Sequence, residues 1–421
     1  MNIYKLKFLR MFDNPLLAGS AVLFIGNMIA NVANYLYHLL MGRMLGPSDY
    51  GILESLISLL YLMEIPLMTL SVVVVKYVSQ FKGEERYKAI GKLYHKLNSQ
   101  LMLFGILGLI CFFLFIPLLA KILRLDNYLW LVMIGLVVFV TIFSGINRSV
   151  LQGLSKFFEL SLSGVIECLG KLFLSIVFLV IGLKVSGALG AMLIAGVLGY
   201  LLSKYFVKDK VKKFDLSENL GRRTMIKYSL PIFVSMLSLT SLFSTDIILA
   251  RYYLTGFDAG LYSALAVLGK IIFFISGPIG MVMFPLISEY KAKEQNYRKI
   301  FLQSLGIVAL VSAGMSIIYF IAPNFIVSML YGTDYLKAAS SLGLFAVFLS
   351  FFSIVSLFVN YYISINKYKL ILLTFPAAIL QVVFIIIFHQ NINQLVWVSV
   401  VVLGLLALLL MLYYLRYEKE N

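Results

Sequence analysis

The sequence predicts an all-α, polytopic membrane protein with about twelve transmembrane helices. The chain has 421 residues and is 61% hydrophobic, with a mean hydropathy of +0.96, which is typical of a protein that crosses a membrane many times. Apolar runs of about 20 residues recur along the whole chain, and short polar turns separate them. The basic residues gather in every second turn, as the positive-inside rule predicts for membrane-spanning chains.

The apolar runs can be assigned limits along the chain. At about 1.5 Å per residue, most are long enough to cross the hydrocarbon core of a bilayer. The predicted spans are 17–41, 52–76, 98–119, 129–149, 159–182, 186–206, 229–250, 260–286, 301–322, 338–362, 370–388 and 394–415. The first run follows three basic residues but is too long for a signal peptide, so we expect an uncleaved first span. Pro66, Pro231, Pro278 and Pro285 are expected to permit bends in the second, seventh and eighth spans.

The first span carries a stripe of polar side chains. Asn27, Asn31, Asn34 and His38 recur at steps of four, three and four residues. This spacing places them on one face of a helix. Amides that face lipid would lack hydrogen-bond partners, so this face must meet other helices or a wet cavity. Hydrogen bonds to neighbouring helices are one interpretation. We favour a cavity lining, because four polar groups on one line are more than helix packing needs.

Seven ionisable residues fall inside later spans, where a charge is costly and usually faces a partner or a cavity. They are Glu54, Glu64, Lys76, Glu167, Lys171, Asp246 and Lys270. Glu167 precedes Lys171 by four residues, so an ion pair along one helix is one interpretation. Lys270 lies deeper in its span than Lys76, which could reach the cytoplasmic interface. Three more cations stand at span ends: Arg43, Arg148 and Arg251.

The distribution of charge predicts the orientation. With the N-terminus in the cytoplasm, cytoplasmic segments and adjoining span ends hold 26 of the 35 Lys and Arg residues, whereas outer segments hold 6. This asymmetry places both termini on the cytoplasmic side of the cell membrane. Nearly all of the net charge of +16 then lies in cytoplasmic turns. There it is expected to set topology and contact anionic lipid rather than nucleic acid.

The chain is predicted to consist of two related halves. The longest connection, 207–228, is a basic cytoplasmic linker between an N-terminal six-helix bundle, 1–206, and a C-terminal six-helix bundle, 229–421. Three sequence matches relate the halves. Asp49-Tyr50-Gly51 matches Asp258-Ala259-Gly260, VSQFKGEE resembles ISEYKAKE at the same offset of 209, and LSKF resembles INKY. Six spans per half give both copies the same orientation, about an axis along the membrane normal, which is a transporter arrangement.

The sequence shows no catalytic signature. It has no GxxxxGK[ST] loop to bind a nucleotide, and its three histidines show no metal-ligand spacing. Cys111 and Cys168 lie in different spans and are expected to be core residues. We therefore predict a protein that is not an enzyme, has no cofactor or metal, and uses an ion gradient or the substrate's own gradient.

Three motifs resemble a known family. GRMLGPSDYGIL after the polar first span, then KYVSQFKGEERY, then LQGLSKF are similar to the polysaccharide-transporter (O-antigen flippase) family. That family belongs to the multidrug/oligosaccharidyl-lipid/polysaccharide exporter superfamily. The resemblance implies two six-helix bundles that form a V, with a central cavity lined by helices 1, 2, 7 and 8. Twelve spans fit this branch better than the lipid II flippases, which usually have fourteen.

The resemblance also implies a function. Members move polyprenyl-diphosphate-linked oligosaccharides from the cytoplasmic to the outer leaflet for cell-surface polysaccharide biosynthesis, in contact with the bilayer and with glycan assembly machinery. Amides can bind sugar hydroxyls, and cations can bind a diphosphate. The predicted substrate-binding residues are Asn27, Asn31, Asn34, His38, Arg43, Arg251 and Lys270. The predicted ion-coupling residues are Glu54, Glu64 and Asp246.

The main alternative is a cation-coupled multidrug exporter of the same superfamily. Such a protein would be expected to have a more apolar cavity with one or two acids. The amide stripe and the Asp49-Tyr50-Gly51 turn favour the flippase. A membrane enzyme or a scaffold is the remaining alternative.

Overall fold

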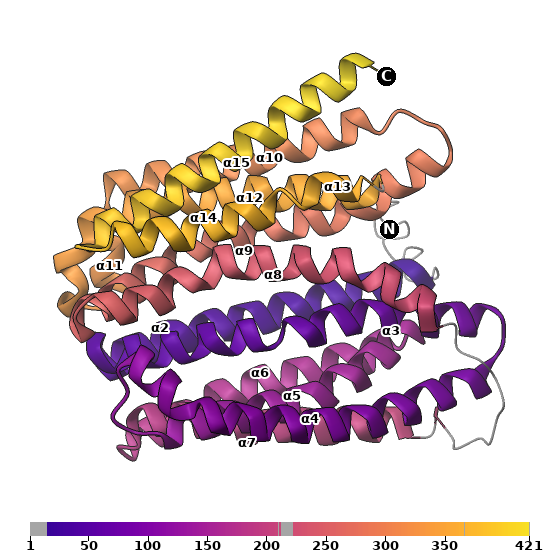
Figure 1. Cartoon of the computed structure of the whole chain (residues 1–421), viewed down its shortest axis with the longest axis horizontal. Helices are drawn as coiled ribbons and strands as arrows, with labels where there is room; N and C mark the ends of the chain where they lie inside the picture. Colours follow the sequence, from indigo (N-terminus) through magenta and orange to yellow (C-terminus); the bar gives the residue numbers. More distant parts are fainter. Residues whose placement is uncertain (1–14, 209, 212–221, 366, 421) are drawn as a thin grey trace, which may run out of the picture. The chain divides into compact units, whose positions relative to one another are not determined.

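The computed structural model describes residues 15–208, 210–211, 222–365 and 367–420, and within these ranges every regular element is a helix. Figure 1 shows the helices in the order of the chain. Their bounds are α2 Pro15–Met63, α3 Ile65–Gly83, α4 Tyr87–Leu123, α5 Leu129–Gly153, α6 Phe157–Val180, α7 Lys184–Lys208, α8 Arg222–Tyr253, α9 Gly256–Ala292, α10 Arg298–Ile321, α11 Pro323–Leu330, the 3-10 helix η1 Thr333–Ser341, α12 Leu342–Ser364, α13 Tyr368–Ile371, α14 Thr374–Ile387 and α15 Ile392–Glu420. The predicted all-α membrane fold is confirmed.

All twelve predicted spans fall on helices. Among the residues that the structure describes, nine helices are long and apolar enough to cross a membrane, and the bent pair α2 and α3 makes a tenth. The total reaches twelve when α2 is divided at Gly46, where the helix is broken, and when the shorter apolar helix α14 is included.

Two breaks shape the first pair of spans. Gly46 has a non-helical φ of 74° and ψ of 170°. Glycine adopts this φ freely, and Pro47 disfavours helical backbone in the residue before it. A second break follows Met63, where α2 and α3 meet at a bend of 42°. Pro66 is the second residue of α3, where a missing N–H costs little. The predicted bend of the second span is therefore confirmed.

The described chain forms two compact units. Unit 1 comprises Met1–Met41, Pro66–Lys121 and Asp126–Ser229, and unit 2 comprises Gly42–Ile65, Ile122–Leu125 and Leu230–Asn421. The unit boundaries fall inside α2 and α8. The bundle limits 1–206 and 229–421 stay predictions, as do the V and the central cavity. Residues 212–221 of the predicted linker lie outside the described residues.

Unit 1 is built on α7, which packs against both α5 and α6. Hydrogen bonds between polar side chains join its helices, in addition to apolar contacts. Tyr94 on α4 donates a hydrogen bond from its hydroxyl to Asn147 Oδ1 at 3.0 Å, and Asn147 Nδ2 donates to Ser203 Oγ on α7 at 3.2 Å. Each side-chain bond of this kind stabilises helix association in a membrane by about 0.6 kcal/mol.

Unit 2 is organised around α12, which packs against α9, α10 and α15. The sequence of α12, LGLFAVFLSFFSIVSLFVNYYIS, is apolar on every face and rich in aromatic residues, as expected of a helix with protein on most sides. Phe301 of α10 illustrates the packing, because its ring lies 4.2 Å from Tyr361 of α12 and 4.8 Å from Tyr414 of α15. Figure 1 shows these helices running alongside one another.

The two copies of the first repeat motif meet inside unit 2. Gly51 and Gly260 are equivalent residues, and a Cβ on Gly51 would lie 2.7 Å from the backbone nitrogen of Gly260. A Cβ on Gly260 would overlap the carbonyl of Pro47. The repeated glycine thus permits backbone-to-backbone contact between α2 and α9. This contact explains why glycine stands at the same place in both copies.

Gly260→Ala is expected to destabilise the protein strongly, because the new methyl group would meet backbone that cannot rotate away. Overpacking of this kind costs about 1–3 kcal/mol or more. Gly277→Ala is the matched control, since the same helix has open space there. Thermal unfolding in detergent should show a lower midpoint for Gly260→Ala alone. Equal midpoints for the two variants would contradict the close approach.

The other repeated motifs form a pair of lysine caps. Lys82, at the end of α3, donates hydrogen bonds from Nζ to the carbonyl of Leu154 and to Ser155 Oγ, both at 3.0 Å. The equivalent Lys291, at the end of α9, donates to the carbonyl of Ile365. In both copies the motif thus binds the C-terminal carbonyls of a neighbouring helix, α5 or α12, where a cation is favourable.

The turns that follow the caps also match. Glu85 and Glu294, one in each copy, have positive φ values of 56° and 54°. Burial, together with the charge of Lys367, lowers the pKa of Lys291. The VSQFKGEE and ISEYKAKE motifs are therefore structural elements, and the sequence match between the halves reflects a shared helix-capping geometry.

Candidate functional site

The polar stripe lies on the α2 part of unit 1. Asn27 and Asn31 are exposed, whereas Asn34 and His38 are half-buried. The helix is fixed on its other side by Gly26, where a Cβ would lie 2.6 Å from Ser161 Cβ of α6. Close packing thus holds α2 against α6 while two amides of the stripe face away from protein. Hydrogen bonds between helices account for Asn34 but not for Asn27 and Asn31.

Asn34 connects the stripe to α6. Its Oδ1 accepts a hydrogen bond from Lys171 Nζ at 2.6 Å, and its Nδ2 points at Cys168 Sγ at 3.5 Å. The same ammonium lies 4.4 Å from the centre of the Tyr37 ring, a cation–π distance. The stripe therefore includes a cation from another helix, which the sequence alone did not place beside it.

Glu167 pairs with a different helix from the one that its spacing suggests. Arg148 of α5 donates to Glu167 Oε2 at 2.6 Å and to the carbonyl of Ser163 at 3.0 Å. The i to i+4 arrangement allows a Glu167–Lys171 pair, but the structure joins Glu167 to Arg148 and Lys171 to Asn34. An ion pair between Glu167 and Lys171 stays a prediction beside these contacts.

Unit 2 holds a cluster of buried charges. Glu54 on α2, Asp246 on α8 and Lys270 on α9 are 1%, 1% and 5% exposed. Lys270 Nζ lies 4.2 Å from the centre of the Phe243 ring, within the electrostatic reach of both acids. Because a buried charge is expensive unless another compensates it, the three groups are expected to depend on one another.

Asp246 is incompletely satisfied. Tyr262 donates a hydrogen bond from its hydroxyl to Asp246 Oδ2 at 2.7 Å, while Asp246 Oδ1 is buried with no hydrogen-bond partner among the described residues. A buried acceptor without a partner costs about 1–3 kcal/mol. Native structures usually explain such a group by a functional role or by a small bound species.

Tyrosines surround the Glu54 end of this cluster. The hydroxyls of Tyr50 and Tyr331 lie 3.2 Å apart, and Glu54 interacts with Tyr50. Tyr335 donates a hydrogen bond from its hydroxyl to the carbonyl of Gly42 at 2.6 Å. Tyr50 belongs to the repeated Asp-Tyr-Gly turn, so this motif contributes both a close backbone contact and a hydroxyl beside a buried acid.

Arg251 is buried and engaged with backbone. Its guanidinium donates to the carbonyls of Leu123 and Arg124 at 3.0 and 3.1 Å. Arg124 in turn donates to the carbonyl of Leu254 at 3.1 Å. The two arginines thus cap the ends of each other's helices. A substrate contact at Arg251, which stays a prediction, would require the guanidinium to leave these carbonyls.

The two remaining predicted residues are more accessible. Arg43 is exposed and donates from Nη1 to the carbonyl of Met329 at 3.3 Å. Glu64 is half-buried and lies at the break between α2 and α3. The structure thus divides the predicted site into the stripe of unit 1 and a charged group in unit 2.

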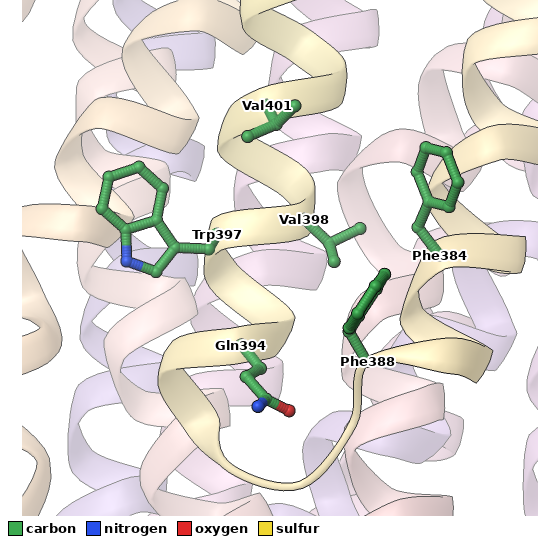
Figure 2. Close-up of a pocket in the computed structure, with 6 residues that line it drawn as sticks. All are labelled: Phe384, Phe388, Gln394, Trp397, Val398 and Val401. Carbon is green, nitrogen blue, oxygen red and sulfur yellow. The ribbon is translucent and has the colours of Figure 1, made fainter.

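An apolar cavity of about 350 Å³ lies between α14 and α15 of unit 2. Its lining residues are Phe384, Phe388, Gln394, Trp397, Val398 and Val401. Figure 2 shows Phe388 and Val398 between the two helices, Gln394 near the loop that joins them, and the Trp397 ring on the other side of α15. The cavity contains none of the predicted site residues. Its apolar lining is typical of a surface that meets lipid chains rather than sugars.

The family of this chain follows from a comparison of its sequence with models of known families. A sequence model of the family described as "Polysaccharide biosynthesis protein" matches residues 16–291. The chain belongs to this family. An uncharacterized membrane protein of Methanocaldococcus jannaschii is 24% identical over 290 residues, which are 65% of this chain and 68% of that protein. The protein is thus a multi-pass membrane protein of the polysaccharide biosynthesis protein family.

Solved structures of low identity share the fold. An inward-facing multidrug resistance MATE family transporter of the MOP superfamily has a TM-score of 0.75 at 15% identity, over 95% of this chain and 99% of that chain. The lipid II flippase MurJ, in an inward closed conformation, also has a TM-score of 0.75, at 14% identity over 94% and 87% of the two chains. The predicted family is confirmed by the family model, and the chain shares its fold with these two transporters.

Proposed function

We propose that this family member is a flippase for polyprenyl-diphosphate-linked oligosaccharides. It moves the glycan head from the cytoplasmic to the outer leaflet, while the prenyl tail remains in lipid. The product serves cell-surface polysaccharide biosynthesis. The protein acts in the cell membrane with both termini in the cytoplasm, and glycan assembly machinery is its expected partner.

The observation that carries this proposal is the exposure of Asn27 and Asn31 on a membrane-spanning helix. Amides in contact with hydrocarbon would lose several kcal/mol of hydration, so a face that presents them is expected to meet water or a polar ligand (roughly 2–7 kcal/mol per group). Sugar hydroxyls are such a ligand, because each can both donate to and accept from an amide. His38 lies on the same face of the helix as the asparagines, and Arg43 is proposed as a separate substrate contact.

Ion coupling is assigned to the acids of unit 2. Asp246 has a buried carboxylate oxygen with no hydrogen-bond partner among the described residues. Both Asp246 and Glu54 interact electrostatically with Lys270. Protonation or cation binding at such a carboxylate changes the balance of buried charge, which can bias one conformation over another. Glu64, at the break between two helices, is the third coupling candidate, and Arg251 and Lys270 are proposed to contact the diphosphate in another conformation.

One observation favours the alternative, a cation-coupled multidrug exporter. The chain is as similar in fold to a MATE transporter as to MurJ, and its buried acids suit a cationic drug as well as a coupling ion. Against it stands the α2 stripe, which presents amides and a lysine where a cationic drug would be expected to meet acids.

Transport by purified protein in liposomes tests the proposal. A polyprenyl-diphosphate oligosaccharide with a labelled sugar is placed in one leaflet, and a glycosidase outside the vesicle reports its appearance in the other. We expect protein-dependent movement that responds to an imposed proton or sodium gradient and does not need ATP. Transport of a cationic dye without movement of the glycan would support the exporter, and a strict need for ATP would contradict gradient coupling.

A further inference from the structure

We propose that Lys171 binds the anionic group of the transported glycan lipid. Together with Asn31, Asn34 and Tyr37 it forms a headgroup subsite on α2 and α6. The anionic group is either the diphosphate or an acidic sugar, since an ammonium beside amides recognises both. This inference rests on the proposed function and adds to it a residue outside the predicted cavity helices.

The position of the ammonium is the first argument. Lys171 lies within a membrane-spanning helix, yet its Nζ is 2.6 Å from Asn34 Oδ1, on the line of amides that begins at Asn27. The lysine is half-buried, and its ammonium lies beside the stripe. A cation in a membrane span usually marks a substrate or ion path.

The second argument is the way the lysine is held. A neutral amide and the face of the Tyr37 ring fix its ammonium, at 2.6 Å and at 4.4 Å from the ring centre. Glu167, one turn away on α6, pairs with Arg148 at 2.6 Å. Such an arrangement orients the cation before the ligand arrives, which lowers the entropy cost of binding.

The third argument is the contrast with the cations of unit 2. Arg251 is 7% exposed and bound to two carbonyls, and Lys270 is 5% exposed and surrounded by acids. In the conformation described, both are less accessible than Lys171. The lysine of α6 is therefore the cation best placed for a first contact with the headgroup.

Cys168 provides a native reporter for this subsite. Its thiol lies 3.5 Å from Asn34 Nδ2, whereas the other cysteine, Cys111, is exposed on α4. In a Cys111→Ser background, a small maleimide would modify Cys168 alone. A bound headgroup should shield this thiol, so the rate of modification measures occupancy.

The experiment compares shielding of Cys168 by a polyprenyl-diphosphate oligosaccharide in four proteins, all in the Cys111→Ser background. The Cys111→Ser parent should be shielded, Lys171→Gln should need at least about tenfold more ligand, and Lys171→Arg should stay within about threefold of the parent. Lys76→Gln, an exposed lysine of α3, is the matched control and should behave as the parent. Thermal midpoints in detergent identify any variant that fails to fold. If Lys171→Gln fails to fold, the test becomes glycan export by Lys171→Arg, compared with export by the parent.

The outcomes separate this inference from the proposed function. Equal shielding and equal export for Lys171→Gln and the parent would overturn the role of Lys171 and leave the flippase intact. Absence of glycan binding and transport in the parent itself would overturn the flippase. If phosphatidylglycerol shields Cys168 as well as the glycan lipid does, the site binds phospholipid and the inference fails. If Lys171→Gln also weakens shielding by a neutral glycan on the same carrier, the lysine binds the diphosphate. If Lys171→Gln weakens shielding only by acidic glycans, the lysine binds the acidic sugar.

Discussion

Replacement of Asn27 and Asn31 by leucine is expected to lower glycan export at least about tenfold while the protein stays in the membrane at its normal level. Both side chains are exposed, so the double variant removes no packing within the molecule. Leucine favours a membrane span more than asparagine does, and insertion should not suffer. Each lost hydrogen bond to a sugar costs about 0.5–1.5 kcal/mol, and two together reach about a factor of ten or more.

The matched control uses the same helix. Met28→Leu with Val32→Leu changes two exposed apolar residues of α2 and should keep normal export. Membrane abundance and export are measured separately for both variants. Normal export by the asparagine double variant at normal abundance would contradict a substrate role for the stripe.

Asp246→Asn is expected to abolish coupled transport and to destabilise the protein. The buried Lys270 would lose its nearest compensating charge, and Glu54 would replace it only in part. Breaking a buried set of charges in this way costs on the order of 2 kcal/mol. The thermal midpoint in detergent should fall, and transport should lose its response to an ion gradient.

A triple variant separates stability from function. Asp246→Asn with Glu54→Gln and Lys270→Met removes all three charges of the cluster, and replacement of every member of a buried charge set is often neutral. The triple variant should therefore regain most of its thermal stability and remain inactive. Full recovery of gradient-driven transport together with stability would show that the three charges serve the fold alone.

The sequence predicted those features that depend on local periodicity. The spacing of Asn27, Asn31, Asn34 and His38 fixes one helical face, whatever packs against it. The number of helices follows from the long apolar runs, because the thickness of the bilayer sets the length of a span. The basic residues in every second turn agree with this number, because basic turns lie on the cytoplasmic side.

Contacts between helices could not be predicted in this way. Lys171 and Asn34 are 137 residues apart, and no local pattern relates them. The same holds for Arg251, whose carbonyl partners come from the end of α4. The repeat offered a partial guide, since Lys82 and Lys291 recur with their target segments. It marked these residues as equivalent without showing that each caps a helix.

Photo-crosslinking at α2 tests most directly whether the glycan passes along the stripe. A photoreactive residue replaces Asn31 in one protein and Ile29, an exposed residue on another face of the same helix, in a second. Each is reconstituted with a polyprenyl-diphosphate oligosaccharide that carries its label in the sugar. We expect the labelled sugar to crosslink to position 31 and not to position 29. Phospholipid crosslinks at both positions, with no labelled sugar at 31, would contradict passage of the glycan head along α2.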